Sequence, residues 1–484
     1  MNVLLITLDQ FRGDCLSIAG HPVVKTPNLD RLAQQGVRFT RHYSQASPCA
    51  PGRASLYTGM YQMNHRVVAN GTPLDRGIDN VALMARRAGY TPTLFGYTDQ
   101  SIDPRLADGP DDPRLSSYEG VLPGFECALD ITKNYDSWRT WLRDRGYEAD
   151  GDVRTLLSTE NERPVDMSVS TFLTDQLLEW MGNQEQGWFA HASFIRPHPP
   201  YSAAGEFSTM YDPAHVGEPI AAADDVHPFH QLMLALDGTK APTDAKELAH
   251  MRAQYFGMVS EVDAQLGRIW SALEESGQWD NTIILVTADH AELLGDHGLK
   301  EKVGYWETSQ HILSIIRDPR HAAAHGSTID QFTENVDILP TLSDMLEQEV
   351  PSQCDGLPLT PFIEGNVPPI WRESAHWEYD WRFSLVPHYP HGVPFKRHLE
   401  TMNLAVQRSN EYAYVQFADG DWLCFDLVAD PTWRTPVTDP AIVMREAQSM
   451  LQWRMRNTNR THSDFLVENG GIGRWPRDVP WRST

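Results

Sequence analysis

Residues 3–9 read VLLITLD, and residues 282–290 read TIILVTADH. Each stretch is a short, continuous apolar run closed by an acidic residue, which is typical of a strand buried on both faces of a sheet. Ligand sites of open α/β sheets gather at the carboxyl ends of the strands. An aspartate after a strand is as often a plain turn residue. Asp9 and Asp289 together, with His290 beside them, favour a site for one divalent cation.

Predicted strands and helices alternate over the first 370 residues. Strands are expected at 3–8, 37–43, 188–195 and 282–287, and helices at 27–35, 51–58, 170–181, 248–275 and 336–346. The alternation predicts an α/β fold with a central, mostly parallel sheet flanked by helices. Two stretches with weak periodicity, 101–165 and 202–247, are expected to pass over a site or an interface.

Near Pro368-Pro369 the alternation of strands and helices gives way to consecutive short strands. Short strands are predicted at 403–407, 413–417 and 422–427, the last two joined by a hairpin turn, and a helix follows at 445–455. We therefore divide the chain into a catalytic domain, 1–370, and a smaller subdomain with an antiparallel sheet, 371–484. Eight of the 15 tryptophans lie in this second part. They are expected to pack the subdomain, with a subunit interface or a wall of an aryl-ester pocket as alternatives.

Composition excludes several classes of function. The chain has 484 residues, and 40 Lys and Arg against 65 Asp and Glu give a net charge of −25. That balance argues against nucleic acid and against an anionic membrane surface as partners. No stretch approaches the roughly 20 apolar residues of a membrane span. The start of the sequence does not resemble a signal peptide, and the five cysteines include no CxxC pair, so we expect a cytoplasmic protein in a reducing compartment.

The most specific feature is the stretch from Ser47 to Arg53, which reads SPCAPGR. It places a small nucleophile, Cys49, at the start of a predicted helix, where the backbone N–H groups and the helix dipole favour an anion. Arg53 lies one turn further on and could reach the same anion. The alternative is a buried cysteine in front of a helix that begins with proline.

Residues 49–53 resemble the CxPxR signature of the sulfatases, a family of the alkaline-phosphatase-like superfamily. The resemblance extends along nearly the whole chain. Leu8-Asp9-Gln10 is similar to the first metal strand of the family, and the stretches at 287–290 and 295–298 are similar to its DHG and GxHG motifs. Phe425-Asp426-Leu427 with Asp430-Pro431 resembles a motif near the family's C-termini.

The resemblance implies the chemistry of the site. Cys49 would be converted to formylglycine by a formylglycine-generating maturase, and formylglycine 49 would ligate one divalent metal together with Asp9, Asp289 and His290. The nitrogen ligand favours Mn²⁺, with Ca²⁺ as the alternative. One hydroxyl of the hydrated aldehyde would attack sulfur or phosphorus, and C–O cleavage would later restore the aldehyde.

The same resemblance assigns the leaving-group side of the site. His198, in Arg196-Pro197-His198-Pro199, would be a general acid, and Lys302 would lie near the leaving-group oxygen with Arg53 as a further catalytic cation. Lys300 competes with Lys302 for this position. His21, His65 and His297 are expected to be structural.

Several positions resemble the phosphonate monoester hydrolase branch and its arylsulfatase relatives. Gln10 stands where typical sulfatases have a second aspartate, and His290 where they have asparagine. Four residues are expected to contact the substrate: Gln10, Asn70, Tyr97 and Asp99. Asp99 departs from the branch, which has a neutral hydroxyl residue there. An acid beside an anionic substrate is unfavourable unless it is protonated, paired or turned away.

The sequence thus predicts a sulfuric ester hydrolase, arylsulfatase-like, that is promiscuous towards phosphonate monoesters and phosphodiesters. The alternative reverses that preference: a phosphonate monoester hydrolase or phosphodiesterase with side activity on sulfate esters. In both, the substrate is a small anionic ester, and a homo-oligomer is expected. A mutase or phosphotransferase, and a non-catalytic acidic binding protein, are less favoured because the CxPxR match and the ligand positions are intact.

Overall fold

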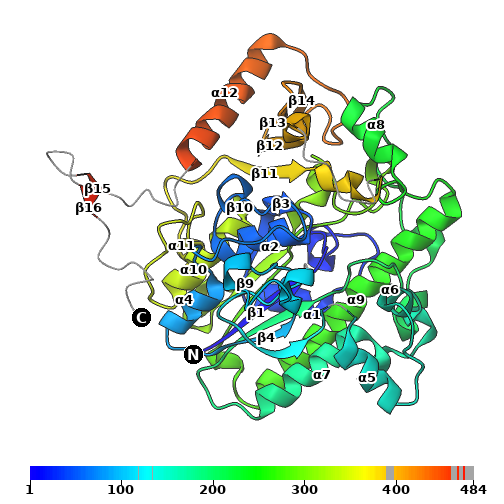
Figure 1. Cartoon of the computed structure of the whole chain (residues 1–484), viewed down its shortest axis with the longest axis vertical. Coiled ribbons are helices and arrows are strands. Elements are labelled where there is room, and N and C mark those ends of the chain that lie inside the picture. Colours follow the sequence, from blue (N-terminus) through cyan, green and yellow to red (C-terminus); the bar gives the residue numbers. More distant parts are fainter. Residues whose placement is uncertain (118, 133, 389–396, 459–465, 468–472, 475–484) are drawn as a thin grey trace.

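A large, mostly parallel sheet forms the centre of the protein. A computed structural model describes residues 1–117, 119–132, 134–388, 397–458, 466–467 and 473–474 (Figure 1). The central strand, β1 (Asn2–Leu8), runs parallel to β6 (Phe189–Phe194) on one side and to β7 (Thr282–Thr287) on the other. Leu8 pairs with Phe194 and Thr7 with Thr287, so the three strands end at the same edge.

The other strands of this sheet extend outward from these three. They are β2 (Val37–Tyr43), β4 (Pro92–Gly96), β5 (Glu126–Asp130), β8 (His311–Ile312), β9 (Ser314–Arg317) and β10 (Ser327–Glu334). Their order is β10-β2-β9-β7-β1-β6-β4-β5, with β8 paired to β2. Most pairs are parallel, and β9 runs antiparallel to both β2 and β7. The predicted α/β fold is therefore confirmed.

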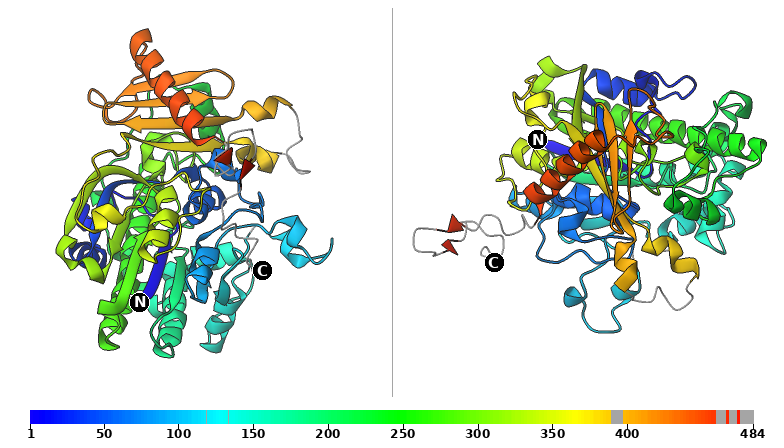
Figure 2. Two further views of the ribbon diagram at one scale, coloured as in Figure 1. Left: turned by 90° about the vertical axis from the view of Figure 1, so that its left-hand side faces the viewer. Right: turned by 90° about the horizontal axis from the view of Figure 1, so that it is seen from above.

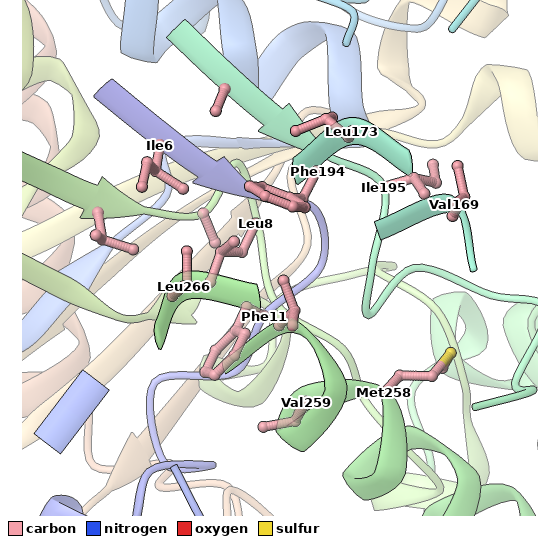
Figure 3. Packing of buried hydrophobic residues seen from close by; sticks show 14 of the residues in the cluster. Ile6, Leu8, Phe11, Val169, Leu173, Phe194, Ile195, Met258, Val259 and Leu266 are labelled. Carbon is pink, nitrogen blue, oxygen red and sulfur yellow. The ribbon is translucent and has the colours of Figure 1, made fainter. Parts of the chain in front are cut away.

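Helices cover both faces of the sheet, as the sequence of β1 requires. Leu4, Ile6 and Leu8 belong to one buried cluster, and Val3 and Leu5 belong to another on the opposite face. The first cluster includes α1 (Pro27–Gln34), α7 (Val169–Gly182) and α9 (Ala245–Glu275), and the second includes α2 (Cys49–Thr58), α4 (Val81–Arg87) and α10 (Ile338–Met345). Figure 3 shows the first cluster, where Leu8 and Phe194 meet Leu266 of α9.

Shorter helices lie in the connecting segments. They are α3 (Gln62–His65), α5 (Asp136–Asp144), α6 (Val153–Ser158), α8 (Pro228–Ala235) and α11 (Thr360–Ile363). The first segment with weak periodicity contains α5 and α6, and Trp141 of α5 packs against Phe172 of α7. Among the described residues, no helix combines the length and the apolar character needed to cross a membrane.

A smaller sheet stacks at one end of the molecule, together with α12 (Pro440–Asn457) (Figure 2). Its strands are β11 (Ser374–Asp380), β12 (Asn403–Ser409), β13 (Tyr412–Phe417) and β14 (Trp422–Asp426), which pair antiparallel in that order. The predicted hairpin between β13 and β14 is confirmed. A pair of two-residue strands, β15 (Leu466–Val467) and β16 (Gly473–Arg474), lies near the C-terminus.

One strand of the smaller sheet comes from the beginning of the chain. β3 (Ala46–Ser47) pairs in parallel with β11, Ala46 opposite Glu378 and Ser47 opposite Tyr379. This pairing joins the segment before Cys49 to the smaller sheet. The division at residues 370 and 371 stays a prediction, but the smaller sheet itself is built from both parts.

The tryptophans of the C-terminal part mostly pack this sheet. Trp377, Trp381 and Trp433 lie in a buried cluster with strand residues of β12 and β13, and Trp453 of α12 stacks on His376. Trp371 packs against Phe362 on the main domain. Packing is thus the role that the structure gives to these side chains, whereas Trp475 and Trp481 lie outside the described residues.

Candidate active site

Helix α2 brings Cys49 to the edge where β1 and β7 end. The helix begins at Cys49, two residues before the predicted start at Pro51, which lies inside its first turn. It ends at Thr58, and the next residue, Gly59, has a left-handed φ of 69°. The helix approaches β7 very closely at Gly52, where an added Cβ would lie 2.5 Å from the Asp289 carbonyl oxygen and 2.9 Å from that of Ala46. Only glycine fits this contact.

Asp9, Asp289 and His290 converge as the strand-end pattern predicted, and Cys49, which the family resemblance added to the set, lies with them. One ligand atom from each of Asp9, Cys49, Asp289 and His290 lies within 4.8 Å of all the others, and all four residues are buried. The His290 Nε2 atom is 3.3 Å from Cys49 Sγ, 3.5 Å from Asp289 Oδ2 and 3.9 Å from Asp9 Oδ1. Opposite ligands of one divalent ion lie about 4–5 Å apart, so the spacing fits a single metal.

Two further observations support a metal at this cluster. The Asp9 Oδ1 atom is buried without a hydrogen-bond partner, although buried carboxylate oxygens are normally satisfied. The His290 Nδ1 atom faces the Ala291 carbonyl oxygen at 3.2 Å, which fixes the N–H on Nδ1 and leaves the Nε2 lone pair for the cluster. Burial and the Lys302 charge lower the pKa of His290, so the imidazole is neutral, as a ligand must be.

Arg53 lies beneath this cluster and is fully buried. Its Nε donates to Asp289 Oδ2 and its Nη2 to Asp9 Oδ2, each at 3.0 Å. Its Nη1 donates to Ser193 Oγ at 2.7 Å. Asp9 Oδ2 also accepts a hydrogen bond of 2.5 Å from Tyr97 Oη. Arg53 therefore compensates the charge of the two aspartates and fixes their orientation, in addition to any contribution to the field at the substrate.

Lys302 and His198 form a hydrogen-bonded pair beside the cluster. The Lys302 Nζ atom lies 2.6 Å from His198 Nε2 and donates to Gln10 Oε1 at 2.7 Å. Burial lowers the pKa of Lys302, but the opposing effects of Cys49, Glu301 and Asp9 outweigh it and the net pKa is raised. Burial and the Lys302 charge lower the pKa of His198, whose Nδ1 faces the Pro199 carbonyl oxygen at 2.7 Å. The shared proton therefore resides on Lys302.

A cavity of about 600 Å³ opens onto these groups. Its lining includes most of the predicted site residues, namely Asp9, Cys49, Asn70, Tyr97, Asp99, His198 and Lys302. Lys300, the competing position, is not part of this lining. The segment 101–165 also contributes to the lining, with Ser116, Tyr135 and Arg154 among its residues, so the expectation that this segment borders a site is confirmed. The segment 202–247 instead contributes α8, whose Phe229 packs against Trp381 of the smaller sheet domain.

Asp99 is buried in the cavity wall and paired. Its Oδ2 atom lies 3.7 Å from Arg53 Nε, and its backbone has a left-handed φ of 53°. Burial raises the pKa of Asp99 to about 8, against the lowering effect of Arg53, and Asp9 raises it further. Asp99 can therefore stand beside an anionic substrate, because its raised pKa favours the protonated carboxyl group and Arg53 lies close enough to compensate the charge of the ionised form.

Sequence reasoning did not single out two acidic residues beside Lys302. Glu292 is fully buried and Glu301 lines the cavity. Both lie in the loop that carries Asp289, His290 and Lys302, and that position in the chain is the one signal that could have indicated them.

Comparison with known proteins agrees with this geometry. Residues 1–348 match the sulfatase family model, and residues 295–461 match the model described as N-sulphoglucosamine sulphohydrolase, C-terminal. The multifunctional alkaline phosphatase superfamily protein PehA of Trinickia caryophylli is 35% identical, covering 97% of this chain and 98% of the other. An arylsulfatase of Clostridium perfringens is 28% identical, covering 78% and 81%.

The crystal structure of the phosphonate monoester hydrolase of Agrobacterium radiobacter superposes with a TM-score of 0.90 at 41% identity, covering 98% of this chain and 100% of the other. The fold and the site define an ester-bond hydrolase of the alkaline phosphatase superfamily. The chain belongs to the sulfatase family. Membership of that family implies, in general, a divalent metal and formylglycine, and the four-residue cluster is the candidate site for both.

Proposed function

We propose that the protein hydrolyses esters whose reacting group carries one negative charge: phosphonate monoesters and phosphodiesters first, and sulfate esters as a side activity. The observation that carries the proposal is the buried cluster of Asp9, Cys49, Asp289 and His290 at the base of the cavity, beside the Lys302–His198 pair. The likeness to the phosphonate monoester hydrolase supports this order of preference, whereas the sequence alone placed sulfate esters first.

We infer that Cys49 is converted to formylglycine by a maturase and that the cluster holds one divalent metal, with Mn²⁺ preferred because His290 offers nitrogen. In the structure the Cys49 Sγ atom stands for the oxygen of that modified residue. When present, the metal and the hydrated aldehyde supply the nucleophilic oxygen and polarise the substrate. The unpartnered Asp9 Oδ1 is the feature of this chain that fits the metal best.

The chain's own residues bind and orient the substrate around this centre. Asn70 Oδ1 accepts the backbone N–H of Ala50 at 2.9 Å, which holds this residue at the start of helix α2, and Asn70 is part of the cavity lining. Tyr97 and Asp99 also line the cavity. Because Asp9 and Asp289 already draw on the charge of Arg53 through hydrogen bonds of 3.0 Å, a second negative charge on the substrate is poorly compensated. Dianionic phosphate monoesters should therefore be worse substrates than monoanionic esters.

Lys302 holds the proton that the leaving group requires. Its raised pKa keeps it charged at neutral pH, and His198 Nε2, 2.6 Å away, accepts one of its N–H bonds and orients the ammonium group. Arg53 holds Asp9 and Asp289 in place through the 3.0 Å bonds described above.

Turnover of a panel of nitrophenyl esters tests the proposal. With Mn²⁺ present, we expect kcat/KM to be highest for phenylphosphonate and a phosphate diester, lower for the sulfate and lowest for the phosphate monoester. Mass spectrometry of the peptide from His42 to Arg53 should find an aldehyde at position 49, and Cys49→Ala should abolish turnover while the fold is retained. Fully active protein with an unmodified thiol would refute the mechanism, and a preference for the phosphate monoester would refute the substrate class.

Leaving-group dependence tests the assignment of the proton donor. Replacing a general acid typically costs ~10²–10⁴-fold when the leaving group needs protonation. Lys302→Ala and His198→Ala should therefore hurt alkyl esters more than nitrophenyl esters, and equal losses would exclude the residue as donor. The homo-oligomer and the cytoplasmic location stay predictions from the sequence.

A further inference from the structure

Glu292 joins three segments at the leaving-group end of the cavity. It is fully buried in the loop after β7. Its Oε1 atom accepts the backbone N–H of Leu294 at 2.8 Å and that of Glu301 at 2.6 Å. Its Oε2 atom accepts from Gln10 Nε2 at the end of β1. One carboxylate thus connects its own loop, the turn at residue 301 and the central strand.

These bonds lead directly to Lys302. Glu301 has a left-handed φ of 68°, an uncommon conformation for a residue with a Cβ, and its N–H bond to Glu292 holds this turn. The turn aims the next side chain, Lys302, at His198. Gln10 presents its Oε1 to Lys302 while its Nε2 is held by Glu292. Both the backbone and the hydrogen-bond acceptor of Lys302 are therefore fixed by the same carboxylate.

We propose that Glu292 is a positioning residue that acts through Lys302: it aligns the ammonium group with the leaving-group oxygen, without touching the substrate. Glu292 is absent from the cavity lining, whereas Lys302 is part of it. The inference rests on the proposed function, because it assigns the proton delivered by Lys302 to the leaving group.

The test uses Glu292→Gln in the full-length, metal-loaded protein. Glutamine keeps the size of the side chain but has a single acceptor oxygen, so one of the three N–H groups would face an NH₂ group. We expect kcat for an alkyl phosphonate ester to fall at least 10-fold more than kcat for the nitrophenyl ester, with little change in KM. Adding Glu292→Gln to Lys302→Ala should lower activity no further, since the residue acts through the lysine.

A matched control separates this role from plain loss of a buried carboxylate. Asp263 is also buried and accepts three N–H bonds, from the backbone of Asn28 and Leu29 and from the Asn28 side chain. Asp263→Asn should lower activity on both esters equally, if at all.

Three outcomes would overturn the proposal: equal losses on both esters in Glu292→Gln, no loss at all, or additive losses in the double variant. Aldehyde content at position 49 and the unfolding midpoint are measured for every variant, so that a maturation or folding defect is recognised. If the unsubstituted protein hydrolyses none of the esters, the proposed function has failed, and that result is distinct from all three.

Discussion

Helix α2 approaches the end of β7 so closely that one methyl group at Gly52 should disturb the site. In Gly52→Ala the new Cβ would lie 2.5 Å from the Asp289 carbonyl oxygen, and ordinary contact begins at 3.4 Å. The helix must therefore move by about 0.9 Å, but the Ala46 carbonyl oxygen at 2.9 Å obstructs a simple slide. Both obstacles are backbone atoms, which cannot rotate out of the way.

The displacement has a cost in stability and a larger one in rate. Overpacking of this kind typically lowers the free energy of unfolding by ~1–3 kcal/mol. Arg53 and Cys49 move with the helix, while Asp289 is fixed by the sheet, so the 3.0 Å bond between Arg53 and Asp289 is strained. Misplacing catalytic groups by about 1 Å can lower the rate ~100-fold. We expect a loss of that size in kcat for the nitrophenyl phosphonate.

Urea unfolding and steady-state turnover, normalised to the aldehyde at position 49, measure the two effects separately. Gly182→Ala is the control, because Gly182 ends helix α7 in open space where alanine is tolerated. It should leave turnover unchanged and stability equal or slightly higher. Unsubstituted rates per aldehyde in Gly52→Ala would refute the reasoning from close approach.

Four further results are expected. Burial lowers the pKa of His65 and His191 to about 3, whereas in the unfolded chain both side chains take up a proton near pH 6.5. The free energy of unfolding should therefore decrease as the pH falls below 6.5, by up to ~1.4 kcal/mol per pH unit for each group. An unfolding midpoint unchanged between pH 7 and 5 would contradict this. Added salt should raise kcat/KM for anionic esters at low ionic strength, since a net charge of −25 repels them at long range, and a falling profile would speak against it. Arg372→Met should lower the free energy of unfolding in urea by ~3–5 kcal/mol, because it leaves Glu334 and Asp337 buried without their cation. A decrease below ~1 kcal/mol would show that the two ion pairs of Arg372 contribute little to stability. A chelator should abolish turnover and lower the unfolding temperature, and Mn²⁺ should restore both; full activity without metal would exclude the proposed cofactor.

The sequence predicted the central strands because their signal is local. A strand buried on both faces must be apolar throughout, and the runs at 3–8 and 282–287 are. The carboxyl ends of neighbouring parallel strands meet at one edge of the sheet, so the sequence alone was enough to predict that Asp9 and Asp289 lie together.

Other features depend on contacts that no local pattern records. β3 is two residues long and exists because β11, more than 320 positions later, pairs with it. Helix α2 begins at Cys49 and not at the predicted Pro51. The reason is that contacts with other parts of the chain fix this segment: β3 pairs with β11 just before it, and Gly52 packs closely against the backbone after β7. The position of Glu292 in a loop does not indicate a role for it, because its partner Gln10 is 282 residues earlier in the chain and only the fold brings the two together.

The pairing of β3 with β11 has a consequence for the order of events during synthesis. Cys49 is 4% exposed in the folded protein, and the strand just before it is bonded to residues 378 and 379. If a maturase acts on Cys49, as proposed above, it would have access to the surrounding segment until that distant strand is synthesised. About 330 residues separate the two, and at ~5–20 residues per second the ribosome needs roughly 15–60 s to make them. The pairing of β3 with β11 thus limits the time during synthesis in which the proposed modification of Cys49 can take place.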